Sequence, residues 1–114
     1  MADGALTAIG GGSANRTSDL AATVGGGQQN VASGENSTIS GGFAHVASAQ
    51  DATIGGGSTD TASGTGSTIS GGVVNVAAGS YSTVGGGAYN YAHGLFATVS
   101  GGGGFSQVDS NSAS

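Results

Sequence analysis

The sequence predicts an all-β protein built as a parallel β-solenoid, and three observations lead to that fold class. A hexapeptide, typified by residues 52–57, recurs every fifteen residues with no insertion. A fixed period of this size is typical of a short structural unit stacked on itself. Glycine is abundant, with 26 of 114 residues, and neither a helical period nor a Leu-rich stripe is present, so helices are not expected.

The centre of each hexapeptide is one aliphatic residue, here named the anchor. We expect the anchors to point inward and to form one continuous ladder: Ile9, Val24, Ile39, Ile54, Ile69, Val84 and Val99. Thr precedes most anchors, Gly or Ser follows them in alternation, and two glycines come next. The β-branched residues favour a strand at this place, and the glycine pairs favour a turn.

A second short extended segment follows in each unit, typified by residues 30–33. Its fixed alanines are expected to form a second inward ladder: Ala32, Ala47, Ala62, Ala77 and Ala92. Asn stands two positions earlier in most units, with His45 and Asp60 as the exceptions. The repeats predict seven coils of fifteen residues, with equivalent strands about 4.8 Å apart.

The chain divides into an N-terminal lead (residues 1–6), a β-solenoid repeat domain (7–106) and a polar C-terminal tail (107–114) that we expect to fray or to act as a linker. Residues 1–6 show no signal-peptide pattern, and no apolar run is long enough to span a membrane. Arg16 is the only basic residue and the net charge is −5, so nucleic acid and anionic lipid are poor partners. The absence of Cys excludes disulfides and thiolate metal sites.

One coil holds too little apolar material to be stable alone. It buries a single Val or Ile, worth about 2 kcal/mol, against roughly 1–2 kcal/mol of backbone entropy per residue. Backbone hydrogen bonds return only ~1 kcal/mol each. This deficit predicts an obligate homo-oligomer, in which copies of the chain pack around a shared axis.

Residues 68–79 read Thr-Ile-Ser-Gly-Gly-Val-Val-Asn-Val-Ala-Ala-Gly. This order resembles the head repeats of YadA-like trimeric autotransporter adhesins, roughly S-V-A-I-G-x-x-A-x-A-x-G, and the resemblance extends over residues 7–106. It is similar to the variant S-T-V-S-G-G-x-x-N-x-A-S-G, which also occurs in phage and other fibre proteins. The chain departs from the family pattern in three ways: its units are one residue longer, Gly replaces the second aliphatic residue, and Asn mostly replaces the first Ala.

The resemblance implies a left-handed parallel β-roll in a homotrimer. It also implies an extracellular, cell-surface head that adheres to host-surface protein, carbohydrate or abiotic surfaces, next to neighbouring fibre domains. The chain shows no neck, heptad stalk or barrel pattern, so the resemblance carries no expectation of outer-membrane attachment. Two alternatives stay open: a virion or phage tail fibre, and a monomeric ice-binding β-solenoid suggested by the Thr column. In each case we expect no catalytic, cofactor or metal site.

Two groups of polar and aromatic residues are candidate sites. The Asn column could be a binding row, or its amides could bond the turn backbone in the left-handed conformation and stack as ladders. A metal between His45 and Asp60 would lack a third ligand. A candidate ligand-contact patch near the carboxyl end holds Tyr81, Tyr89, Tyr91 and Phe96, with Leu95 nearby. These side chains could grip carbohydrate or protein, or they could cover the end of the stack.

Overall fold

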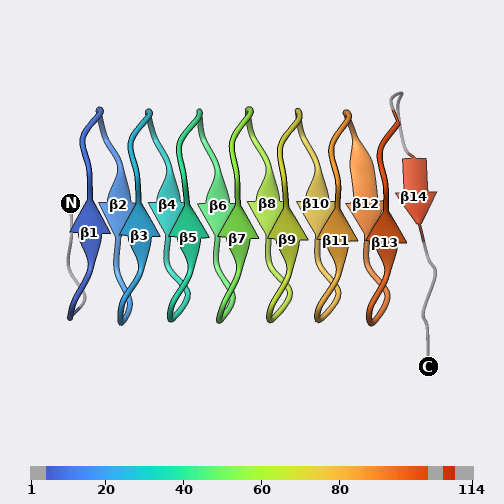
Figure 1. Ribbon diagram of the computed structural model, residues 1–114, viewed down its shortest axis with the longest axis horizontal. Helices are drawn as coiled ribbons and strands as arrows, with labels where there is room; N and C mark the ends of the chain where they lie inside the picture. The colour runs from blue at the N-terminus through green and yellow to red at the C-terminus, as the bar shows by residue number, and fades with distance from the viewer. Residues whose placement is uncertain (1–4, 103–106, 110–114) are drawn as a thin grey trace.

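The structure is a computed structural model that describes residues 5–102 and the backbone of residues 107–109. It is all-β, with parallel strands stacked as a β-solenoid (Figure 1). The stack forms a flat slab with extents of 35 × 27 × 14 Å. Residues 1–4 of the expected lead and 110–114 of the expected tail lie outside the described residues.

Two short strands alternate along the chain. The odd-numbered strands contain the anchors: β1 (Ala8–Ile9), β3 (Thr23–Val24), β5 (Thr38–Ile39), β7 (Thr53–Ile54), β9 (Thr68–Ile69), β11 (Thr83–Val84) and β13 (Thr98–Val99). The even-numbered strands follow the anchors: β2 (Arg16–Thr17), β4 (Val31–Ala32), β6 (Val46–Ala47), β8 (Thr61–Ala62), β10 (Val76–Ala77), β12 (Asn90–Ala92) and β14 (Gln107–Asp109).

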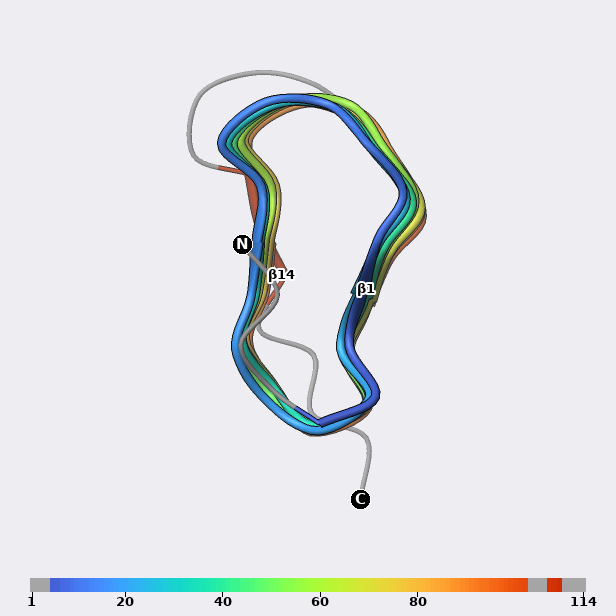
Figure 2. The ribbon, with the colours of Figure 1, turned by 90° about the vertical axis from the view of Figure 1, so that its left-hand side faces the viewer.

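The odd and even strands form two parallel sheets of seven strands each. Neighbouring strands pair residues fifteen positions apart, as Ile54 pairs with Ile69 between β7 and β9. Successive turns therefore superpose in the view along the stack (Figure 2). The last step differs, because Asn90 of β12 pairs with Gln107 of β14, seventeen positions on. A strand thus occupies the start of the segment expected to be a polar tail.

The interior of the slab is filled by the two expected ladders. The five central anchors are fully buried, whereas Ile9 and Val99, in the outermost odd strands, are partly buried against them. All five alanines of the even strands are also fully buried. Thr53, which precedes its anchor, faces outward and is half-buried. This alternation follows from strand geometry, in which successive side chains point to opposite faces.

A third buried ladder lies two residues before the anchors, in addition to the two inward ladders that the repeats predict. Its members are small and fully buried: Ala22, Ser37, Ala52, Ser67, Ser82 and Ala97. The signal is visible in the sequence, because these positions hold only Ala or Ser and share the inward face with the anchors. The slab is only 14 Å thick, so each turn holds one larger apolar side chain, the anchor. The fixed alanine and the position two residues before the anchor hold small side chains.

Two sets of turns close the flattened ring (Figure 2). The glycine edge, at the top of Figure 1, leads from odd to even strands and comprises residues 11–14, 26–29, 41–44, 56–59, 71–74 and 86–89. The acidic edge, at the bottom, leads from even to odd strands and comprises residues 18–22, 33–37, 48–52, 63–67, 78–82 and 93–97. We call it acidic because it holds three exposed acidic residues: Asp19, Glu35 and Asp51.

The corners of the ring use left-handed backbone at residues other than glycine. Asp51 at the acidic edge and Thr59 at the glycine edge both have a φ of 59°. Each amide at these corners donates to a carbonyl of the preceding turn, Asp51 to Glu35 and Thr59 to Phe43, at 2.8 Å. A left-handed non-glycine residue costs on the order of 1–3 kcal/mol. These bonds offset part of that cost and hold the corners in line.

Gly57 shows why part of each turn must be glycine. Its φ is +98°, and a Cβ there would lie 2.0 Å from the carbonyl oxygen of Gly72 in the next turn. Any side chain would force the two turns apart and break the register on both sides of the edge.

The substitution Ile54→Asp tests the inward placement of the anchors. It introduces a carboxylate with no partner into a fully buried position, and such a charge costs roughly 3–5 kcal/mol. We expect the β-sheet signal in circular dichroism to be lost at room temperature. Thr53→Asp is the matched control, since Thr53 faces outward, and it should keep the fold. A folded Ile54→Asp protein would show that the anchor does not point inward.

Candidate functional site

The polar column two residues before the fixed alanines is buried rather than displayed on the surface. Its members are at most 4% exposed: Asn15, Asn30, His45, Asp60, Asn75 and Asn90. The left-handed corner lies one residue earlier, for example at Gln29 and Val74, so the expectation that Asn itself adopts this conformation is wrong. Asn30 instead precedes β4 and shares its inward face with Ala32.

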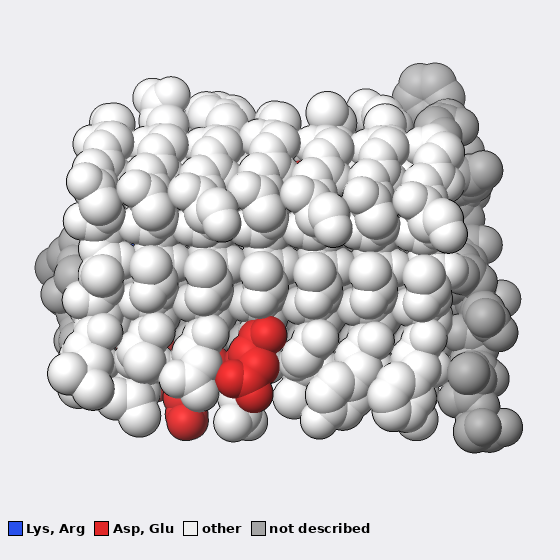
Figure 3. Space-filling model, viewed as in Figure 1, with Lys and Arg blue, Asp and Glu red and all other residues white. Residues whose placement is uncertain are grey.

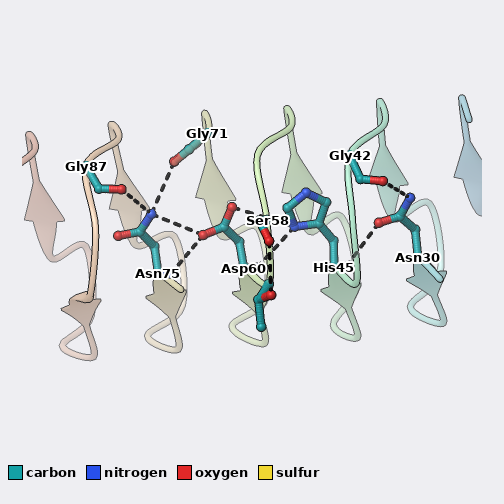
Figure 4. Close-up of polar contacts among 9 residues, drawn as sticks. Asn30, Gly42, His45, Ser58, Asp60, Gly71, Asn75 and Gly87 are labelled. Carbon is teal, nitrogen blue, oxygen red and sulfur yellow. Dashed lines mark hydrogen bonds and ion pairs between the residues drawn. The ribbon is translucent and has the colours of Figure 1, made fainter. Parts of the chain in front are cut away.

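The side-chain amides of Asn30 and Asn75 each link three consecutive turns, as Asn30 illustrates. Its Nδ2 donates to the carbonyl oxygens of Gly26 at 3.0 Å and Gly42 at 2.9 Å, and to Oδ1 of Asn15 at 3.2 Å. Its Oδ1 accepts the backbone N–H of His45 at 3.0 Å (Figure 4). The amide suits this place because it carries two donor hydrogens and a two-lone-pair acceptor on one short side chain.

His45 supplies only part of this pattern. Its Nδ1 accepts the backbone N–H of Asp60 at 3.1 Å, so Nδ1 carries no proton and the neutral ring is protonated at Nε2. Nε2 is buried and has no hydrogen-bond partner among the described residues. The longer imidazole also misses the carbonyl of Gly41, which corresponds to the one that Asn30 reaches at Gly26. The ladder is therefore incomplete at this turn.

Asp60 supplies the complementary part. Its Oδ1 accepts the backbone N–H of Asn75 at 2.8 Å and the Nδ2 of Asn75 at 3.1 Å. Its Oδ2 is buried without a hydrogen bond and lies 3.6 Å from Nδ1 of His45 (Figure 4). Because that Nδ1 already accepts an N–H, the two side chains form no hydrogen-bonded ion pair in this tautomer.

Burial raises the pKa of Asp60 above its ordinary value of 3.8, because the interior disfavours the charged carboxylate. The backbone and side-chain hydrogen bonds from Asn75 offset only part of this effect. A protonated Asp60 would have an O–H where the ladder elsewhere has an amide donor. The pair is thus a weak point of the ladder rather than a reactive site, since both side chains are fully buried.

The hypothesis of a metal between His45 and Asp60 gains no third ligand from the structure. Within residues 5–102, no group of three His, Asp or Glu side chains lies close enough to hold a metal ion. The same part of the chain contains no helix that is long and apolar enough to cross a membrane.

The aromatic residues of the candidate ligand-contact patch do not form one surface. Tyr81 and Phe96 lie on the acidic edge, Tyr89 lies on the glycine edge, and Tyr91 lies on the outer face of β12. All four are exposed, as is Leu95. Sequence proximity suggested a single patch, but the path of each turn carries successive aromatics to opposite edges of the slab (Figure 1).

The two aromatics of the acidic edge stack along the solenoid axis. The rings of Tyr81 and Phe96 are nearly parallel, with centroids 5.4 Å apart. The ring of Tyr81 also lies over Gly66, where an added Cβ would come within 2.7 Å of it. Tyr81 thus contacts the turns on both sides of it along the stack although it stays exposed, which favours a role in covering the stack over gripping a sugar ring.

Tyr91 forms a separate contact with a residue that the sequence analysis did not assign. Its ring meets that of His93 edge-on, with centroids 5.3 Å apart. Both side chains are exposed, Tyr91 on β12 and His93 directly after the strand ends. The spacing of two residues between Tyr91 and His93 is the signal that could have indicated this pair.

The Thr column forms a row along the outer face of the odd-numbered sheet, and this face is uncharged apart from the acidic edge (Figure 3). The neighbouring column alternates between Ser and Gly, as at Ser40 and Gly55. A Cβ at Gly55 would lie 2.3 Å from the carbonyl oxygen of Ser70, so that glycine cannot become Ser without a shift of the next turn. The second row of hydroxyls is therefore interrupted at alternate turns.

No known protein-family model matches this chain, and no curated protein matches it significantly. The resemblance to adhesin head repeats therefore depends on the pattern of residues alone.

The substitution Asp60→Asn tests the weak point in the ladder. The folded protein holds the Asp60 proton more tightly than the unfolded chain does. The contribution of Asp60 to the free energy of unfolding is therefore greatest below about pH 3.8, and it falls as the pH rises through the raised pKa of Asp60. Asn removes this loss and restores an amide donor, so we expect a gain of about 1–3 kcal/mol in the free energy of unfolding at pH 7.

Urea unfolding at pH 4 and pH 7 measures this gain, which should be smaller at the lower pH. Asp51→Asn, at an exposed corner of the acidic edge, is the control and should change stability by less than about 0.5 kcal/mol. Equal or lower stability of Asp60→Asn at pH 7 would contradict the assignment of Asp60 as an unfavourable buried carboxylate.

Proposed function

We propose that this chain is a structural and adhesive segment of an extracellular, homotrimeric surface fibre. In this proposal the coils are left-handed, each has fifteen residues, and three chains associate side by side. Adhesion to host-surface protein or carbohydrate comes from weak contacts that are repeated along the stack and over three copies. Multivalent contacts of this kind raise avidity by 10²–10⁴ without a strong individual site.

The observation that supports the proposal most is the division between constant interior columns and variable exterior ones. The inward anchors are always Val or Ile, and the inward alanines of β4 to β12 do not vary. The outward residue of the even strands β2 to β12 is less constant, because three are Val and the others differ: Arg16, Val31, Val46, Thr61, Val76 and Tyr91. Such a scaffold can present different side chains at a regular spacing without any change in its core.

The chemistry of the two histidines supports a role without catalysis. His45 is fully buried with Asp60, so a substrate could not reach either of them. His93 is exposed, and its ring contacts Tyr91 rather than a carboxylate or a hydroxyl nucleophile. A virion tail fibre would use the same architecture and the same multivalent mechanism, and it is the alternative setting within this proposal.

Ice binding is a second candidate because of one specific feature. The Thr side chains form a regular, uncharged row on the flat face of the odd-numbered sheet (Figure 3). The interrupted Ser and Gly row beside it weakens this candidate, since a flat two-dimensional match to a lattice needs more than one complete row. A monomer that produces thermal hysteresis would favour ice binding over the fibre.

Light scattering coupled to size-exclusion chromatography tests the homotrimer. The chain has a mass of 10.5 kDa, and we expect a species of three times that mass at micromolar concentration. Beads coated with the trimer should retain matrix proteins or glycans more strongly than beads carrying an unrelated protein of equal charge. A monomeric mass would refute the trimer, and a trimer that retains no surface ligand would limit the role to a fibre segment.

A further inference from the structure

We infer that the glycine edge is the surface on which copies of this chain meet. The inference depends on the proposed homotrimer and adds which part of the slab faces the shared axis. Three independent observations carry it: the distribution of charge, the exposed apolar residues of the central turns, and a glycine column that the single chain does not require.

Within residues 5–102, exposed negative charge is confined to the opposite edge. Asp19, Glu35 and Asp51 all lie on the acidic edge, and the last two side chains occupy its central turns. The glycine edge holds no charged residue in any of its six turns, and Asp60 is buried beneath it. Copies that met at the acidic edge would bring like charges together, whereas copies that meet at the glycine edge keep those charges far apart and in water (Figure 3).

The glycine edge also exposes large apolar side chains where no end effect can explain them. Phe43 and Val73 are 42% and 44% exposed and lie in central turns of the stack. The outward valines of the adjoining sheet, Val31, Val46 and Val76, are only half-buried. Ser58 lies between Phe43 and Val73 in the stack, so these side chains form an interrupted apolar row beside the valines. Exposed apolar surface away from the ends of a soluble protein favours an interaction site.

The first glycine of the edge has no conformational explanation within one chain at most of its positions, the exceptions being Gly11 and Gly86 with φ of 159° and 158°. This position is Gly in all seven repeats, as at Gly41 and Gly56. Its φ lies outside the left-handed region at both residues, and a Cβ would meet no atom within 4 Å. Glycine at such a position costs conformational entropy without an internal benefit. The missing Cβ would instead allow the backbone of a second chain to approach this position closely from outside.

A second copy of this chain is the occupant that fits best. It has the same axial spacing, so each of its turns can meet an equivalent turn along the whole stack. The edge alone, 35 Å by 14 Å, offers roughly 500 Å² per chain, and a stable pair buries about 800 Å² per partner. The interface therefore extends from the glycine edge on to the outward valines of the even-numbered sheet.

Spin-label distances test which edge faces the axis. The chain has no Cys, so Gln28→Cys on the glycine edge and Gln50→Cys on the acidic edge each give one labelled site. Both side chains are exposed, and neither position belongs to the glycine column. Because the slab is 27 Å wide, we expect clearly shorter distances between labels at position 28 than at position 50.

Two other results would contradict the assignment of the glycine edge or the trimer itself. Shorter distances at position 50 would overturn the glycine edge and keep the trimer. Absence of dipolar coupling at both positions would overturn the trimer together with the edge.

The double substitution F43S/V73S tests the apolar contacts of the same edge. We expect the dissociation constant of the oligomer to rise at least tenfold, because two exposed apolar contacts are removed from the interface. Y81S/L95S on the acidic edge removes side chains that are more exposed, and it should leave the dissociation constant unchanged. The inference would be wrong if the second variant weakened the oligomer more than the first.

Discussion

Every turn of this protein must bring its Val or Ile anchor to the same place, because no other large apolar side chain of the described turns is fully buried. The other inward residues are Ala, Ser and the polar column, and they fill the narrow slab without contributing much apolar area. A slip of one residue would turn the anchor outward and bring its Thr neighbour inward. The fifteen-residue spacing between paired residues is thus the condition for a core, and both sheets and both edges depend on it.

The polar column shows how a thin interior meets its hydrogen-bonding requirements. The amides of Asn30 and Asn75 each join their own turn to the turns before and after it, and these bonds help to maintain the register. His45 and Asp60 are neighbours in the column, and each supplies part of what an amide provides. Their adjacency limits the loss, because the intact amides of Asn30 and Asn75 lie on both sides of them.

The β-branched anchors and turn glycines were enough to predict the parallel solenoid, both strands of each turn and the two apolar ladders. The inward Asn column was harder, because Asn beside a glycine turn is also typical of a left-handed corner. Its position two residues before the inward Ala, as in Asn30 and Ala32, was the usable signal. The prediction of a single aromatic patch was wrong for a different reason. Tyr81 and Tyr89 are close in sequence, but strand β11 runs between them and places them at opposite edges of the slab. The homotrimer and its handedness stay predictions.

Hydrogen exchange of single backbone amides, followed by NMR, tests the register most directly. The amides of Thr38, Thr53 and Thr68 each donate to a carbonyl of the next turn at 2.9 Å, so they should exchange slowly and in step every fifteen residues. Gln50 and Thr65 lie exposed on the acidic edge, and the structure shows no acceptor for their amides within residues 5–102, so these should exchange fast. If the three Thr amides exchange as fast as that of Gln50, or if protection follows no fifteen-residue period, the stacked register does not exist in solution.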